Sequence, residues 1–353
     1  MTATRPAPPA ATRLGPGVAG LGRRVRDVVV NYGFLALTTG LFAFFAATEP
    51  TFRAGTTIFS MLRFASVVAI LGLGVTFTMI VGGLDLSIGA VSGLGVTLAA
   101  MTMVVYARTG GVAVGVVLLA GAAVGAVNAF LIIRCRIPDL LATLASMFAV
   151  SGLKLLPVSG QSVSAGMPLP DGRIAPGRFT AGFLAIDAGS LGPVPYPVVL
   201  VAVLVAGCWF FLTRTRWGRL MYAVGANPEA ARLAGVRVDA YRLAAYVVSG
   251  VLAALGGLVL ASRIGQGDVS AGNSLLLDAV AVALVGTSVL GLGRPNAGGT
   301  ALGALLVGIV TTGLTIDGFP YYAQDVIKGL VLLVALLISF TLSRRRTRYV
   351  PAV

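Results

Sequence analysis

The feature that most constrains the fold of this chain is a series of long apolar runs, which follow one another along most of its 353 residues. A helix needs about 20 apolar residues, at ~1.5 Å of rise each, to cross the ~30 Å hydrocarbon core of a membrane. Runs of this kind lie near residues 28–48, 62–81, 88–107, 111–133, 138–157, 195–213, 243–262, 276–292, 297–316 and 322–342. The sequence therefore predicts an all-α integral membrane protein with about ten transmembrane helices.

Two of these runs differ from a simple span. The eighth run is short and rich in glycine, and the third begins directly after a glycine turn. Interrupted spans are tolerated in membranes where protein surrounds them or where they line a cavity. We therefore expect some helices to be broken or re-entrant, with these two as the candidates.

The charged residues predict how the spans are oriented. Most of the 26 basic residues are arginines in the two terminal segments and in the connections that an even number of spans places on the same side. Lysine and arginine accumulate in the cytoplasmic segments of membrane proteins. We therefore expect both termini to be cytoplasmic, in a multi-pass protein of a bacterial inner membrane.

Composition excludes several other classes of protein. Charged residues make up 11% of the chain, far below the ~25% of soluble domains, and the net charge of +14 comes from arginines at the ends of apolar runs rather than from a nucleic-acid surface. There is no histidine, and Cys135 and Cys208 lack a metal-binding spacing. The two lysines, Lys154 and Lys328, do not stand in a phosphate-binding loop. We therefore expect no metal, no cofactor and no enzyme activity; if ATP drives this protein, another chain hydrolyses it.

The apolar runs form one transmembrane domain, residues 28–342, between two tails. Residues 1–27 are rich in proline, alanine and arginine and predict a disordered basic cytoplasmic tail, and residues 343–353 predict a second basic tail. The outer connection 158–194 carries glycine, proline and serine and predicts an irregular loop or a short re-entrant element. The inner connection 214–242 is the second long link between spans.

The inner connection contains a short helix with clear boundaries. Asn227 is a favourable N-cap, Pro228 suits the first helical position, and Gly235 can end the helix. The two turns between them are about 10 Å long and are marginal in isolation. The helix therefore needs a partner surface, which is either the spans of this chain or another protein.

A glycine-rich turn with a carboxylate joins the second and third spans, and it reads Gly-Gly-Leu-Asp-Leu-Ser-Ile-Gly over residues 82–89. The charge of Asp85 is expensive beside apolar helices unless it is capped or solvated. In one interpretation Asp85 or Ser87 caps the third span and the glycines make the turn. In the other, polar groups from Gly82, Gly83, Asp85 and Ser87 line a translocation path. Both interpretations can hold together.

Other polar positions have two interpretations each. Asp278 lies near the outer end of the eighth span, in a run that ends with Thr287 and Ser288, and it is either a solute contact near the path entrance or an acid favoured by the helix dipole. Asn128 is either a helix–helix hydrogen bond or a ligand contact. Lys328 is explained either by a local ion pair with Asp325, three residues before it, or by a side chain that snorkels to the membrane surface.

Taken together, these segments resemble the carbohydrate ABC-importer permeases of the ribose type. The string from Gly82 to Gly89 is similar to the GG-I-D-L-S-V-G signature of that family. Similar segments follow in the same order: Gly125 to Asn128, Ile137-Pro138 with Ala142-Thr143-Leu144, Arg216 to Gly235, and Asp278 through Gly286-Thr287-Ser288 to Gly303-Ala304. The resemblance covers roughly residues 30–340, almost the whole chain.

The resemblance implies a permease that forms the translocation path for a sugar or a related small polar solute. Its implied partners are cytoplasmic ATP-binding subunits, a second permease copy and an extracytoplasmic substrate-binding protein. The implied coupling element, which would sit on the ATPase, comprises Asn227, Pro228, Glu229, Ala230, Ala231 and Gly235. The candidate residues of the path are Gly82, Gly83, Asp85, Ser87, Asn128, Asp278, Thr287 and Ser288.

The sequence departs from the family pattern at three places, and these leave the substrate open. Leu276 stands where an acid is common, Arg294 follows a glycine-rich turn that usually contains lysine, and Asp139 follows Pro138 where a small or apolar residue is commoner. The alternative function is a stand-alone secondary transporter or facilitator for a small neutral solute. Proton coupling, however, usually requires acids, histidines or lysines at the membrane midplane.

Overall fold

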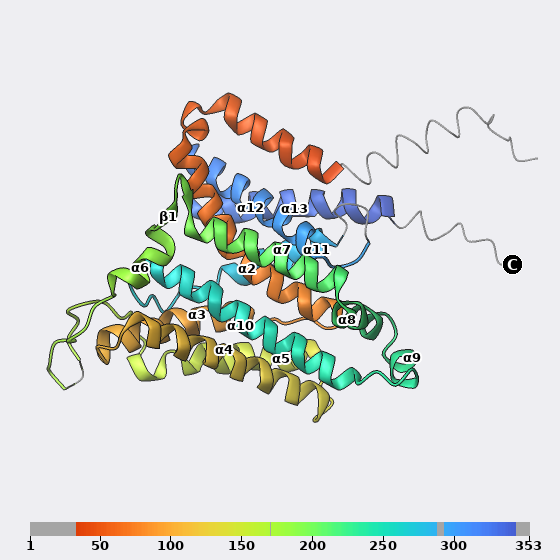
Figure 1. Cartoon of the computed structure of the whole chain (residues 1–353). Helices are drawn as coiled ribbons and strands as arrows, with labels where there is room; N and C mark the ends of the chain where they lie inside the picture. Colours follow the sequence, from red (N-terminus) through yellow and green to blue (C-terminus); the bar gives the residue numbers. More distant parts are fainter. Residues whose placement is uncertain (1–32, 170, 288–292, 344–353) are drawn as a thin grey trace, which may run out of the picture.

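The computed structural model describes residues 33–169, 171–287 and 293–343, and its helices run roughly along one common direction (Figure 1). The helices are Gly33–Thr48, α2 (Gly55–Ile80), α3 (Ile88–Ala100), α4 (Gly110–Ile133), α5 (Asp139–Leu153), α6 (Ala181–Ala188), α7 (Tyr196–Arg214), α8 (Arg216–Ala226), α9 (Pro228–Leu233), α10 (Val238–Ile264), α11 (Leu275–Gly286), α12 (Ala297–Ile316) and α13 (Tyr321–Ser343). The shorter elements are the 3-10 turns η1 (Pro50–Arg53) and η3 (Leu156–Val158), the π-helical turn η2 (Met101–Val105), and the strands β1 (Ser190–Leu191) and β2 (Val194–Pro195).

Seven of the described helices are long and apolar enough to cross a membrane. They are α2, α3 with η2, α4, α5 with η3, α7, α10 and α12. Gly33–Thr48 and α11 are shorter apolar helices, and α13 coincides with the last predicted run. The structure thus confirms the prediction of an all-α membrane protein.

Several predicted boundaries were wrong. α2 begins at Gly55, whereas hydropathy predicted a start near residue 62. α10 begins at Val238, whereas hydropathy predicted a start near residue 243. The added turns contain threonine, serine, aspartate and arginine, which hydropathy excludes but a helix accepts at its ends. α11 ends at Gly286, and the rest of the run predicted to 292 lies mostly outside the described residues, as do residues 1–27 and 344–353.

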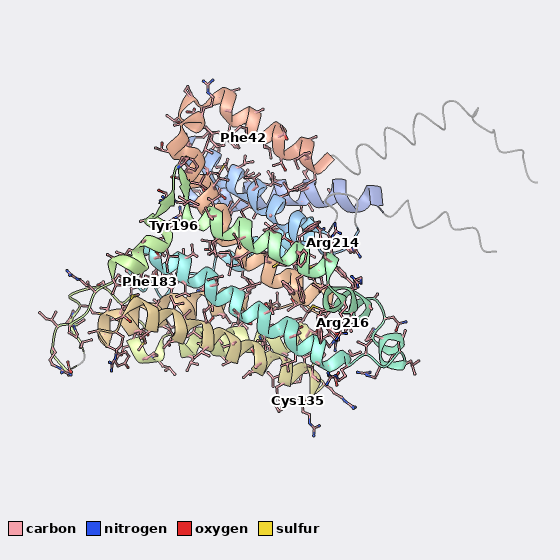
Figure 2. The ribbon with its side chains drawn as sticks, viewed as in Figure 1. Phe42, Cys135, Phe183, Tyr196, Arg214 and Arg216 are labelled. Atoms are coloured by element: carbon pink, nitrogen blue, oxygen red, sulfur yellow. The ribbon has the colours of Figure 1, made fainter. Side chains whose placement is uncertain are left out.

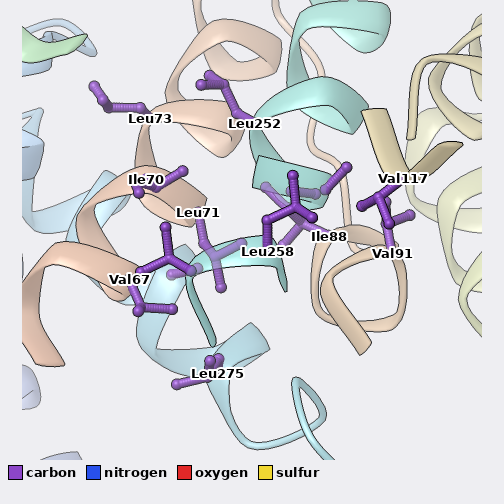
Figure 3. Close-up of a cluster of buried hydrophobic side chains, with 14 of the residues drawn as sticks. Val67, Ile70, Leu71, Leu73, Ile88, Val91, Val117, Leu252, Leu258 and Leu275 are labelled. Carbon is purple, nitrogen blue, oxygen red and sulfur yellow. The ribbon is translucent and has the colours of Figure 1, made fainter. Parts of the chain in front are cut away.

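The long helix α10 occupies the middle of the bundle, where it packs against α2, α3 and α4. The side chains between these helices are fully buried, among them Ile70, Leu71 and Leu258 (Figure 3). Where α4 meets α10 the contact is backbone to backbone, because a Cβ on Gly121 would collide with the carbonyl oxygen of Gly250. Small residues allow helices to approach this closely in lipid, which accounts for part of the high glycine content.

The connection between η3 and α7 combines irregular backbone with the short helix α6 and the antiparallel hairpin β1–β2, in agreement with the predicted loop. An isolated bridge between Val163 and Gly267 joins it to the loop after α10. The backbone N–H of Asp187, in α6, donates to the Ser262 hydroxyl at 3.0 Å, and its carboxylate lies 3.7 Å from the Arg63 guanidinium. These contacts hold α6 against the ends of α2 and α10.

Candidate functional site

The glycine-rich turn between α2 and α3 is buried among helices that are distant in the sequence. α2 ends at Ile80, and Gly82 then adopts a φ of +85°, which residues with a side chain rarely adopt. The chain turns back within seven residues, and α3 begins at Ile88. This reversal places Asp85 and Ser87 inside the bundle, where Asp85 is only 1% exposed.

Three donors satisfy the Asp85 carboxylate. One oxygen accepts from the Ser87 backbone N–H at 2.9 Å and from the Ser87 hydroxyl at 2.6 Å. The other oxygen accepts from the Ser249 hydroxyl of α10 at 2.8 Å. A buried charge is tolerated only when it is hydrogen-bonded in this way. Asp85 therefore does two things at once: it holds the turn locally and it ties the turn to α10.

Asn128 extends this network to α4. Its side-chain Nδ2 donates to the Ser87 hydroxyl at 2.9 Å, and the residue is fully buried. Its Oδ1 is buried without a hydrogen-bond partner among the described residues. An unpartnered buried polar atom is costly and deserves an explanation, such as a bound solute or water. Asp85, Ser87, Asn128 and Ser249 form a cluster, which we call the polar cluster, at the meeting point of α3, α4 and α10.

α5 and α10 contact the turn from a second side. A Cβ on Gly83 would collide with the Asp139 carboxylate and with the Tyr246 hydroxyl, which donates to that carboxylate at 2.9 Å. The Thr143 hydroxyl lies 3.3 Å from the Leu84 carbonyl oxygen. Glycine at position 83 is therefore required by close packing, and the unusual Asp139 is part of that packing.

A cleft of about 630 Å³ opens beside the turn at this point, and Gly82, Gly83, Asp139 and Arg242 are among its lining residues. It offers a carboxylate, a guanidinium and the backbone of the turn side by side. Such groups donate and accept hydrogen bonds, which suits a polar solute with several hydroxyl groups.

α8 contacts the turn from a third side. A Cβ on Gly225 would collide with the Ile80 carbonyl oxygen, so the backbone of α8 lies directly on the end of α2. The Tyr222 hydroxyl donates to the Pro295 carbonyl at 2.6 Å, and Arg294 lies over its ring at 4.6 Å. Burial raises the pKa of Tyr222 while Arg294 lowers it; the net rise keeps the hydroxyl protonated as a donor. α8 is thus fixed both to the turn and to the connection before α12.

The short helix predicted in the inner connection is present as α9, directly after α8. The Asn227 side chain accepts from the Ala230 backbone N–H at 3.0 Å, Pro228 is the first helical residue, and Gly235 follows with a φ of +79°. These features confirm the predicted N-cap and end of the helix. Ala231 is buried against the rest of the chain, whereas Leu233 is 90% exposed.

Among the remaining predicted path residues, Asp278 and Thr287 do not join the polar cluster. Asp278 is buried in the first turn of α11, 3.8 Å from the Lys328 ammonium, which also pairs with Asp325 at 2.8 Å. The local ion pair expected for Lys328 is therefore confirmed, and it extends to Asp278. The Thr287 hydroxyl donates to the Leu284 carbonyl at 2.7 Å, and Ser288 lies outside the described residues.

Sequence reasoning missed two members of the site. Ser249 and Tyr246 lie in the apolar run of α10 and belong to no recognised motif, and both are fully buried. The one feature of the sequence that could have identified them is that each places a hydroxyl group in the interior of a span. Asp139 was noticed only as a departure from a family pattern, although a carboxylate beside a proline at the start of a span is itself unusual.

Comparison with known proteins places most of the chain among transport permeases. The family described as "Branched-chain amino acid transport system / permease component" matches residues 57–336. The ribose import permease protein of Haemophilus influenzae is 32% identical over 313 residues, which cover 88% of this chain and 93% of that protein. No solved structure matches the chain.

Two relatives in Escherichia coli (strain K12) are also permease proteins. Its ribose import permease protein is 32% identical over 299 residues, 85% of this chain and 90% of that protein. Its xylose transport system permease protein is 29% identical over 360 residues, 88% of this chain and 92% of that protein. These matches confirm the family resemblance that the motifs indicated.

The family match and the membrane-length helices together identify the family of this chain. A permease component carries the solute path of a transport system, and ATP is hydrolysed by a separate subunit of that system. The chain therefore belongs to the family of transport-system permease components, as a multi-pass transport subunit of the bacterial inner membrane.

Proposed function

We propose that this chain forms the translocation path of an ATP-binding-cassette importer for a sugar of the pentose class or a closely related polyhydroxylated solute. The proposal rests on relatives whose names specify ribose and xylose, each aligned over most of both chains. A neutral sugar needs hydrogen bonds but no counter-charge, which agrees with a chain in which 11% of residues are charged.

The observation that carries the proposal is the polar cluster with its adjoining cleft. Asp85, Ser87 and Asn128 lie together in a mainly apolar bundle, and the Oδ1 atom of Asn128 has no partner among the described residues. Intramembrane polar groups of this kind generally mark substrate pathways. The proposed path includes Gly82 and Gly83, whose backbone lines the cleft. Asp278, paired with Lys328, is assigned to the outer part of the same path.

The proposed topology has ten spans with both termini in the cytoplasm. Gly33–Thr48, α11 and α13, added to the seven helices of full membrane length, account for ten, and most arginines then lie on the cytoplasmic side. Cysteine at Leu233, in a chain without Cys135 and Cys208, should react with an impermeant thiol reagent only after the membrane is opened. Cysteine at Ile174, in the outer loop, should react in intact cells. Labelling of both from one side would contradict this topology.

The proposed coupling element is α9 with its flanking residues Asn227 and Gly235. Glu229 and Arg232 form an exposed ion pair at 3.0 Å on its surface, next to the exposed Leu233. An exposed mixed surface of this kind, on a helix that α8 connects to the turn, suits a cytoplasmic partner. The proposed assembly contains two permease copies, two ATP-binding subunits and an external binding protein.

The direct test is reconstitution in vesicles with the ATP-binding subunit and the binding protein. We expect ATP-dependent accumulation of radiolabelled ribose or xylose, no accumulation without ATP, and no ATP hydrolysis by the permease alone. A branched-chain amino acid serves as the competing substrate, because the family description names that class. Accumulation of leucine instead of sugar would overturn the substrate, and accumulation of sugar by the permease alone would favour a secondary transporter.

A further inference from the structure

A second cavity, of about 590 Å³, lies between α2, α7, α8 and α10 at the end of the bundle that carries Arg214 and Arg216 (Figure 2). Its deep wall is apolar: Phe77 and Phe211 line it with ring centroids 6.3 Å apart, together with Val248. Phe77 and Phe211 lie three residues before the ends of α2 and α7, and Val248 lies ten residues inside α10, about 15 Å along a helix of membrane length. The cavity therefore reaches into the hydrocarbon depth, where apolar material rather than water is expected to fill it.

The rim of this cavity has a different composition. Trp217 and Tyr241 line it with ring centroids 6.0 Å apart, and the Arg216 guanidinium lies 5.0 Å from the centre of the Trp217 ring. Arg237 lines the rim as well. Tryptophan and tyrosine are enriched at the level of lipid head groups. The cavity thus runs from the head-group level into the acyl-chain region, and its cations lie at the head-group end.

No acid of the described residues neutralises the two rim arginines. The acids closest to them in sequence, Glu229 and Asp239, both pair with Arg232. Within the described part of the chain, Arg216 and Arg237 make no ion pair, and none of the residues that line the cavity is acidic. Their charge is therefore available to an anion from outside the chain.

We propose that this cavity binds one anionic phospholipid of the cytoplasmic leaflet. One acyl chain lies against Phe77 and Phe211, and the phosphate lies at Arg216 and Arg237. Basic pockets between transmembrane helices on the cytoplasmic side bind anionic head groups, and each arginine near the surface contributes roughly fivefold in affinity. A cytoplasmic protein fits less well, because the apolar wall lies at membrane depth. Since α8 forms one wall, the bound lipid supports the helix that carries Gly225.

The chain has two tryptophans, so Trp209→Phe leaves Trp217 as the single fluorescent reporter on the rim. The full-length variant is placed in phosphatidylcholine vesicles, and its fluorescence is titrated with brominated phosphatidylglycerol or brominated phosphatidylcholine. We expect half-maximal quenching at a roughly 25-fold lower fraction of the anionic lipid, because each of the two arginines contributes roughly fivefold. Ala244→Phe, which fills the cavity, should reduce quenching by both lipids.

Matched arginine variants separate this site from general attraction to a basic protein. Arg216→Gln and Arg237→Gln should each lower the preference for phosphatidylglycerol by roughly fivefold. Arg219→Gln, on the same helix but outside the cavity, should leave it unchanged. Equal quenching by the two lipids, or an equal loss in Arg219→Gln, would overturn the proposal. So would quenching that disappears when the ATP-binding subunit is added, because the cavity would then belong to a protein interface.

Discussion

The Gly82–Ser87 turn and the short helix α9 are both small connections, but they are held in place differently. Besides the hydrogen bonds between Asp85 and Ser87 within it, the turn has hydrogen bonds and close contacts from α4, α5, α8 and α10, which lie far away in the sequence. α9 is defined by its own neighbours, through the Asn227 cap, the Gly235 backbone and an exposed ion pair. The turn therefore responds to any movement of the surrounding helices, whereas α9 keeps its shape and leaves its outer surface free.

α8 connects these two elements. Its last turn carries Gly225, whose backbone lies on the end of α2, and Asn227 follows directly as the cap of α9. In the proposed importer, a displacement of α9 would thus reach the polar cluster through a rigid backbone contact rather than through flexible side chains. Substitutions at four positions test this contrast, and they follow in order of decreasing expected effect on stability.

The largest effect is expected for Asp85→Ala, which removes the acceptor of three hydrogen bonds in a fully buried site. Donors left unpaired in such a site cost about 1–3 kcal/mol each, so we expect the free energy of unfolding to fall by about 3 kcal/mol or more. Thermal unfolding of the purified protein measures this loss. An unchanged melting temperature would show that the turn does not depend on this carboxylate.

Asp85→Asn gives the functional comparison for the same position. It keeps one carbonyl oxygen as an acceptor, so assembly with the ATP-binding subunit should stay intact. If Asp85 serves the path, sugar uptake should fall; if Asp85 only caps the turn, uptake should be nearly normal, because asparagine caps about as well. Co-purification of the ATP-binding subunit and uptake, measured side by side, distinguish these outcomes.

Gly225→Ala should have the next largest effect. The new Cβ collides with the Ile80 backbone, and forced overpacking costs about 1–3 kcal/mol. We expect lower thermal stability, because α8 would no longer pack closely on the turn. For the same reason we expect the rate of transport to fall relative to the rate of ATP hydrolysis. Gly207→Ala in α7 is the matched control, since a Cβ there has open space around it. If the two variants behave alike, the contact between α8 and the turn has no mechanical role.

Asn227→Ala should act locally. Loss of an N-cap costs about 1 kcal/mol, and the cost should fall on α9 alone, because its other contacts are few. We expect faster hydrogen exchange of the amides in residues 228–233 and an unchanged melting temperature for the bundle. Faster exchange that extends into α10 or the Gly82–Ser87 turn would contradict the independence of α9.

Glu229→Arg should have the smallest effect on stability, about 0.5 kcal/mol or less, because its pair with Arg232 is exposed. Its effect on assembly should be larger, since the reversed charge meets the partner surface directly and also opposes the helix dipole. Co-purification with the ATP-binding subunit should decrease, whereas Asp171→Arg, on the outer loop, should leave it unchanged. Normal assembly and normal transport in Glu229→Arg would remove the basis for calling α9 a coupling helix.

The elements that the sequence predicted well depend on local information. Hydropathy over 20 residues located the membrane-length helices, and residue preferences at positions 227, 228 and 235 located α9. The turn at residues 82–87 was also recognisable, because glycine and aspartate have strong local conformational preferences. These properties follow from single residues and their near neighbours, so they need no knowledge of the fold.

The tertiary structure alone decided which further residues surround the turn. Ser249 and Tyr246 lie in an apolar run that gives no sign of what they face, and Gly225 resembles many other glycines. Their roles arise because α10 passes the turn at one particular depth and rotation, which is set by packing against α3 and α4. A hydrogen bond between distant helices depends on distances of a few tenths of an ångström, and only the packed bundle determines such distances.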